Sequence, residues 1–150
     1  MTAQDYFAIQ NLLNLYFQYV DAADFERCGQ LFAQADLTYT QSGKTFSNDP
    51  AGVTAQMQSF VKLYGPEQTP KTRHHSGNII IEAEGDTGAH STCTAVIYQA
   101  TEALPFQAIG SAHYEDQFEK TAKGWIFTAR KIRLDFIGDM RHHLLREVTS

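Results

Sequence analysis

Two adjacent histidines, His74 and His75, are the residues of this sequence best suited to acid–base chemistry. An imidazole titrates near neutral pH, so it can accept or donate a proton under physiological conditions. The three isoleucines that follow predict a buried strand over 71–83, because β-branched side chains pack well on a pleated sheet. Side chains alternate between the faces of a strand, so we expect His74, Ser76 and Ile80 on one face and His75 on the other.

We interpret His74 as a base that faces a pocket built by the rest of the chain. The alternative is that both histidines cap a strand end near water, which is a common place for histidine. The strand alone leaves open which histidine turns inward, because a single β-bulge would exchange their faces.

The composition is that of a globular protein with one domain over 1–150. A net charge of −5 argues against nucleic acid or an anionic membrane as partner. The N-terminus lacks the pattern of a signal peptide, and no apolar run is long enough to cross a bilayer. Cys28 and Cys93 have no metal-ligand spacing, so we expect reduced thiols in a cytoplasmic protein. Ten Phe, seven Tyr and one Trp suit a cavity for a ring-shaped ligand, or equally a large core.

The order of the elements predicts an α+β fold. Apolar residues at helical spacing predict a helix over 3–20, a second after Asp24, and a third from Pro50 to Tyr64. A short hairpin is expected over 37–46, and long strands over 71–83, 89–102, 106–119 and 125–136. Three helices then pack on one face of a curved antiparallel sheet. The polar and basic residues 139–150 are expected to form a loose tail or a contact between subunits.

Several motifs occur in an order that resembles the SnoaL-like group of the NTF2-like superfamily, which includes scytalone dehydratase, bile acid 7α-dehydratase and hexachlorocyclohexane dehydrochlorinase. They lie along nearly the whole chain, at Ile9–Gln10, Tyr16–Phe17, Val20–Asp21, Thr72–Arg73–His74, Gly110, Tyr114–Glu115–Asp116 and Gly124–Trp125 to Arg130. The resemblance implies a cone in which three N-terminal helices and a strongly curved antiparallel sheet enclose a pocket. It does not fix the reaction, because this fold carries isomerases, dehydratases, hydrolases and non-catalytic modules.

The resemblance implies a catalytic dyad of Asp21 and His74, with Arg130 at the position of an arginine in the dehydrochlorinase pattern. Tyr16 matches a tyrosine of the bile acid dehydratase pattern, five residues before the aspartate. The chain also departs from its relatives, since the dehydrochlorinase has Lys at Tyr16. Scytalone dehydratase has Tyr at the position of Val20, and a second His on its next strand falls near Tyr98. The match is therefore to a class of mechanism and not to one substrate.

The chemistry that these residues could perform is elimination of water beside a carbonyl group. His74 would take the proton while Asp21 fixes its tautomer, and Arg130 would hold the developing charge or orient Asp21. The candidate hydroxyl donors are Tyr16, Tyr39, Tyr98 and Tyr114, and we expect the last three to line the substrate pocket with Phe60. Three of these residues also have a purely structural interpretation, in which Asp21 ends a helix, Arg130 forms an internal ion pair, and Tyr16 fills the core.

We therefore expect a dehydratase, a lyase without cofactor or metal, that acts on a cyclic or polyketide-like hydroxy-ketone or a related small hydrophobic or aromatic substrate. His142 and His143 could suggest a metal, but no further ligand stands at suitable spacing. The alternatives are an isomerase or cyclase that uses the same pocket, and a non-catalytic module that binds small molecules or resembles the accessory subunit of a dioxygenase. Apolar residues on both faces of the sheet predict a homo-oligomer, dimer or trimer.

Overall fold

The computed structural model describes residues 1–147 as three helices beside one mixed sheet. The helices are α1 (Ala3–Asp21), α2 (Phe25–Gln30) and α3 (Pro50–Phe60), and the strands are β1 (Asp36–Tyr39), β2 (Lys44–Ser47), β3 (Thr72–Glu84), β4 (Gly88–Thr101), β5 (Leu104–Thr121) and β6 (Gly124–Ile137). The strand order is β2-β1-β6-β5-β4-β3, in which only β1 and β6 pair in parallel. The predicted α+β fold is confirmed.

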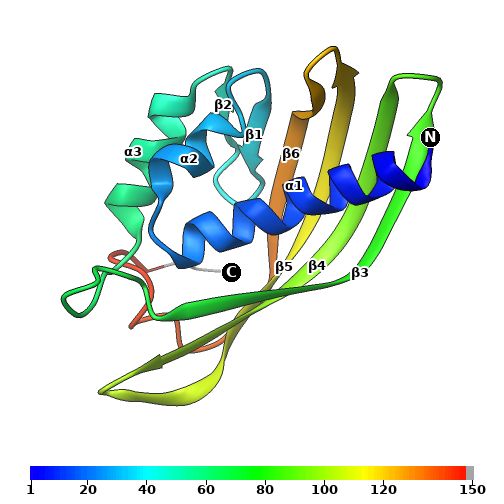
Figure 1. Ribbon diagram of the computed structural model, residues 1–150. Coiled ribbons are helices and arrows are strands. Elements are labelled where there is room, and N and C mark those ends of the chain that lie inside the picture. The colour runs from blue at the N-terminus through cyan, green and yellow to red at the C-terminus, as the bar shows by residue number, and fades with distance from the viewer. Residues whose placement is uncertain (148–150) are drawn as a thin grey trace.

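The helices cover one face of the curved sheet (Figure 1). Helix α1 runs across the long strands, while α2 and α3 gather at one end of the sheet beside β1 and β2. The core between these layers contains Ile9, Leu13 and Phe17 of α1, packed with residues such as Phe32 and Phe127. Burial of this apolar stripe fixes α1 against the concave face of the sheet, and so fixes where its last residue lies.

Side chains cap the start of each helix. Thr2 and Asp5 form a capping box at α1, Asp24 accepts from the backbone N–H of Arg27 at α2, and Asp49 does the same for α3. Each cap satisfies backbone donors that have no partner within the helix. The expected starts of the second and third helices are thus confirmed.

Helix α3 ends at Phe60, earlier than the sequence pattern predicts. Val61 has extended dihedral angles, and the chain here pairs with the C-terminal segment, since Val61 bridges Leu144 and the backbone N–H of Leu145 donates to the carbonyl of Phe60. The helical spacing of Tyr64 therefore does not reflect a helix. Backbone hydrogen bonds to a distant segment replace the hydrogen bonds that a further turn of helix would make.

Strand β3 contains a β-bulge that changes the predicted faces of its isoleucines. The register with β4 shifts between Gly77 and Ile80, and Asn78 adopts a positive φ of 52°. As a result Ile81 is buried in the core, whereas Ile80 is 59% exposed. The expectation that Ile80 shares a face with His74 is therefore wrong, because the bulge adds a residue between them.

The C-terminal segment up to residue 147 packs against the protein, so the expectation of a loose tail over 139–150 is wrong for this part. Met140 and His143 are buried, and the backbone N–H of Lys62 donates to the carbonyl of His143. The side-chain amide of Gln99 donates to the carbonyl of His142. Residues 148–150 of the predicted tail lie outside the described residues.

Within residues 1–147, no helix has both the length and the apolar character that crossing a membrane requires. Cys28 and Cys93 are both buried free thiols. Their burial raises their pKa values, to about 12 for Cys28 and about 11 for Cys93, so neither is a reactive thiolate at neutral pH.

Candidate active site

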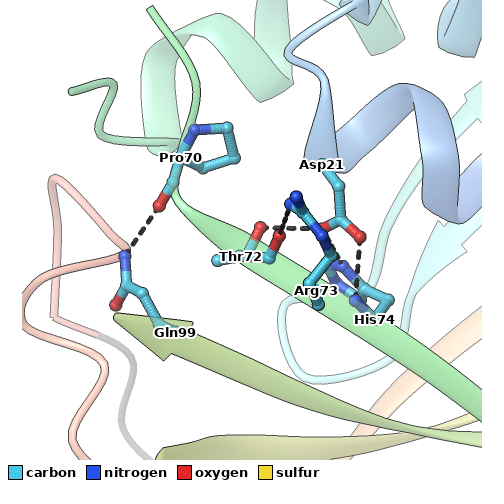
Figure 2. A network of polar contacts seen from close by, with 6 residues as sticks. All are labelled: Asp21, Pro70, Thr72, Arg73, His74 and Gln99. Atoms are coloured by element: carbon cyan, nitrogen blue, oxygen red, sulfur yellow. Dashed lines mark hydrogen bonds and ion pairs between the residues drawn. The ribbon is translucent and has the colours of Figure 1, made fainter. Parts of the chain in front are cut away.

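Asp21 and His74 meet where the end of α1 approaches the start of β3 (Figure 2). Oδ1 of Asp21 lies 2.6 Å from Nδ1 of His74, and Oδ2 accepts the backbone N–H of His74 at 2.8 Å. The hydroxyl of Thr72 also donates to Oδ1, at 2.7 Å. These contacts hold the carboxylate in one orientation against the imidazole.

The environment keeps Asp21 ionised. Partial burial opposes its charge, but the hydrogen bonds and the charge of His74, with the hydroxyl of Thr72, outweigh burial and lower the pKa of Asp21. An ionised carboxylate beside Nδ1 favours the tautomer that carries its proton there. Nε2 of His74 is then the basic nitrogen, which is the arrangement that a general base requires.

Burial and stacking further fix the imidazole of His74. Its side chain is 6% exposed and that of Asp21 is 12% exposed. The ring of Phe17 stacks on the His74 ring, with centroids 5.6 Å apart and an interplanar angle of 20°. His75 points to the opposite face, is exposed, and packs against Tyr98. The bulge lies after both histidines, so it leaves His74 on the inner face.

His74 lines a cavity of about 240 Å³ between α1, α3, the sheet and the C-terminal segment. An apolar cavity of roughly 150 Å³ already holds benzene, so this one has room for a ligand of one or two rings. Gln41, Ser42 and Gln56 add polar side chains to its lining, and Gln41 and Ser42 are exposed. Its apolar lining is formed by Val20, Met57, Phe60, Val61, Ile97, Ala112, Ile132, Leu134, Met140 and Leu144.

Three of the predicted tyrosines line the same cavity, namely Tyr16, Tyr39 and Tyr114. Burial is the main reason that the pKa of each phenol is raised above its ordinary value. The hydroxyls therefore stay protonated at neutral pH and can donate hydrogen bonds to a ligand oxygen. Phe60, also expected in the pocket, is part of its wall.

Tyr98 does not reach the cavity, which corrects its placement among the pocket residues. Its ring stacks on that of Phe106, with centroids 5.4 Å apart, and meets that of His75 edge to face, with centroids 5.5 Å apart, on the outer face of the sheet. Its neighbour Ile97 lines the cavity instead. Because side chains alternate along β4, one of these two residues must face outward.

Arg130 lies in the core, and its contacts fit the structural alternative. Its Nε and Nη2 donate to the two carboxylate oxygens of Asp116 at 2.6 and 2.9 Å, and its side chain has no exposed surface. The guanidinium lies 4.4 Å from the ring centroid of Tyr16 and 4.9 Å from that of Tyr114. Arg130 does not line the cavity, so a role in holding the substrate or Asp21 has no support from its position.

His143 is a residue of the cavity that the sequence argument missed. It is 5% exposed and lies with His74 in the cavity wall, although the two residues are far apart along the chain. Burial is the main cause that lowers its pKa to about 4, repulsion between the protonated rings of His143 and His74 acts in the same direction, and Asp21 acts in the opposite direction. The His142–His143 pair is evident in the sequence, but adjacent histidines without a further ligand at suitable spacing carry no signal for a place in a cavity. Within residues 1–147, no group of three or more His, Cys, Asp or Glu side chains could hold a metal ion.

The fold and this site define a small α+β protein whose curved sheet encloses a cavity lined by a histidine that contacts an aspartate. A family model for the SnoaL-like domain matches residues 1–131, and the chain therefore belongs to the SnoaL-like family of the NTF2-like superfamily. The resemblance seen in the sequence motifs is confirmed. No curated protein matches this chain.

Solved structures share the fold at low sequence identity. A Novosphingobium aromaticivorans protein provisionally named an aromatic ring hydroxylase has a TM-score of 0.72 and 16% identity, and the match covers 95% of this chain and 98% of that one. A provisionally named scytalone dehydratase from the same organism has a TM-score of 0.69 and 22% identity, with 95% and 88% covered. ActVI-ORFA from Streptomyces coelicolor has a TM-score of 0.69 and 15% identity, with 87% and 96% covered. These likenesses show the fold.

Proposed function

We propose that this protein is a cofactor-independent dehydratase that removes water from a small cyclic or polyketide-like hydroxy-ketone. The observation that carries the proposal is the 2.6 Å contact between Asp21 and Nδ1 of His74, in a histidine whose ring lines an apolar cavity. A buried carboxylate–imidazole pair is the usual way to prepare a base near neutral pH. The fold shared with a provisionally named scytalone dehydratase is in keeping with this class of reaction.

In the proposed reaction, Nε2 of His74 takes a proton from the carbon beside the carbonyl group. The electrons of the C–H bond form the enolate, and the carboxylate of Asp21 stabilises the imidazolium. The C–O bond of the β-hydroxyl then breaks as the C=C bond forms, and His74 returns its proton to the departing oxygen. Water leaves, and neither protons nor electrons are gained or lost overall.

The cavity suits the substrate class by size and polarity. Its lining is mostly apolar, with His74, Tyr16, Tyr39 and Tyr114 as convergent polar groups. Protonated tyrosine hydroxyls could donate to the carbonyl or the leaving oxygen. An isomerase or cyclase would use the same proton abstraction. A hydroxy-ketone without a β-hydroxyl group distinguishes these reactions from dehydration, because it can still lose the proton beside its carbonyl but has no β-hydroxyl to eliminate.

The test is proton abstraction and water loss by purified protein. In D₂O, the ketone 2-tetralone should gain deuterium beside its carbonyl, and a panel of cyclic β-hydroxy-ketones should be converted to enones. His74→Gln should lower both rates by about 10²–10⁴-fold. His75→Gln is the matched control, because this neighbouring histidine is exposed on the opposite face.

Exchange and elimination that are equal in wild type and His74→Gln would refute the catalytic role. If the wild-type protein also catalysed neither reaction, the non-catalytic alternative would remain, a small-molecule-binding module or one like a dioxygenase accessory subunit. Tight binding of aromatic ligands by both proteins, without turnover, would then be the expected behaviour.

We also propose that the protein forms a dimer or trimer through the outer face of its sheet. The apolar side chains of Phe106 and Ile80 are 71% and 59% exposed there, and Tyr98 stacks on Phe106. Light scattering that shows a monomer at micromolar concentration would contradict this. The free buried thiols of Cys28 and Cys93 are in keeping with a cytoplasmic, reducing environment.

A further inference from the structure

The C-terminal segment carries His143 into the wall of the cavity that also holds His74. The imidazole is 5% exposed, and its Nδ1 has no hydrogen-bond partner among residues 1–147. Buried polar atoms nearly always have a partner, and one without it is costly. Because the imidazole of His143 is part of the cavity wall, a ligand bound there can accept a hydrogen bond from a ring N–H group.

The charge state of His143 restricts what it can do. Burial and the nearby His74 lower its pKa to about 4, and Asp21 only partly opposes this shift. The ring is therefore neutral at physiological pH, when it has one N–H donor and one basic nitrogen. A neutral imidazole does not give up its remaining proton readily, so His143 is suited to donating a hydrogen bond rather than to transferring a proton. Neutrality also avoids repulsion when His74 becomes an imidazolium.

We propose that His143 donates a hydrogen bond to the carbonyl oxygen of the substrate and stabilises the enolate that forms when His74 takes the proton. This inference rests on the proposed function. No bond to His143 forms or breaks, and its proton stays on the ring. A fixed donor aimed at the oxygen where charge develops lowers the barrier, because it needs no reorganisation during the reaction.

Arg130, the other candidate for stabilising the enolate charge, forms its hydrogen bonds elsewhere. Arg130 gives Nε and Nη2 to Asp116 in the core, and although its buried Nη1 has no partner among residues 1–147, the residue does not line the cavity. His143, by contrast, reaches the cavity from the side of the C-terminal segment, whereas His74 lies on β3. A substrate in the cavity would thus contact a base from the sheet and a donor from the segment.

The side chain of Gln99 ties these two parts of the site together. Its Nε2 donates to the carbonyl of Pro70, just before β3, and to the carbonyl of His142, both at 2.9 Å. Figure 2 shows the contact with Pro70. Tyr64 also donates to the carbonyl of His142. Gln99 is therefore a positioning residue, because it links the segment before His74 to the segment that carries His143.

The first test uses 4-nitrophenol, a one-ring probe whose ionised form resembles an enolate and whose absorbance reports its charge. Its affinity is measured in the ionised and in the neutral form, by titration on either side of its own pKa. Loss of one hydrogen bond to the ionised oxygen should weaken phenolate binding by about 10- to 100-fold in His143→Leu, and neutral phenol less. His143→Gln, which keeps a donor, should retain part of the preference.

The second test is deuterium exchange into 2-tetralone, with kcat and KM measured separately. His143→Leu should lower kcat by about 10²–10³-fold with a smaller effect on KM, as expected for a group that acts mainly in the transition state. The matched control is His142→Asn, since His142 is the adjacent histidine and does not line the cavity. Circular dichroism at each pH confirms that the variants are folded.

The outcomes separate this inference from the proposed function. If His74→Gln abolishes exchange while His143→Leu matches the wild type in exchange and phenolate affinity, the dyad stands and the role of His143 is overturned. If the wild type exchanges no ketone at all, there is no enolate to stabilise and both proposals fall. Loss in both His74→Gln and His143→Leu, but not in His142→Asn, supports both.

Discussion

Acid should destabilise the folded protein through His143, because the folded state holds this imidazole neutral while the unfolded chain can protonate it. Burial and the charge of His74 lower its pKa from 6.5 to about 4 in the folded protein. Between these values the unfolded state binds more protons, so the free energy of unfolding falls as the pH falls. The whole difference corresponds to about 3 kcal/mol, of which about 2 kcal/mol should be lost between about pH 7 and pH 4.5.

The assay is urea denaturation followed by circular dichroism at these two pH values, for the wild type and for His143→Leu. The variant has no imidazole to protonate, so its loss of stability on acidification should be smaller by about 2 kcal/mol. Carboxylates with lowered pKa values, such as Asp21 and Asp139, also lose their contribution, but at still lower pH and in both proteins. His142→Asn serves as the control for removing a histidine from the same segment.

Equal acid sensitivity in the wild type and His143→Leu would refute the reasoning. It would mean that His143 takes up a proton as readily in the folded protein as in the unfolded chain, so that burial does not lower its pKa. The argument that the folded state holds this ring neutral in mild acid would then fail, and this measurement needs no substrate.

Three further predictions follow from other contacts. Asp21→Asn should lower kcat for exchange by about 10²–10⁴-fold while the protein stays folded. The reason is that an amide can hold the His74 ring in place but does not favour the tautomer with a basic Nε2. An unchanged rate would contradict the catalytic dyad. Arg130→Met should destabilise the protein by about 3–5 kcal/mol in urea denaturation, since it leaves Asp116 buried without its partner, and Lys131→Met on the exposed face is the control. Phe106→Asp should shift the protein toward monomer in light scattering, because it places a charge in the proposed contact. Phenol binding should stay unchanged, because the outer face does not line the cavity. An unchanged molecular mass would place the contact elsewhere.

The sequence alone predicted the features that depend on neighbours within a few residues. The apolar spacing of α1, the caps at Asp24 and Asp49, and the β-branched run of β3 each encode a local hydrogen-bonding pattern, and the structure has these elements. The motif resemblance added that the end of α1 and the start of β3 come together, and the 2.6 Å contact between Asp21 and His74 shows that they do.

The tertiary structure decided which side chains share the cavity. Tyr98 faces outward because its neighbour Ile97 faces in, Arg130 is held by Asp116 on the adjacent strand, and His143 enters from a segment that looked like a polar tail. Local spacing could not give these positions. They depend on the pairing of strands and on backbone hydrogen bonds between segments far apart in the chain, and those contacts form only when the whole core is packed.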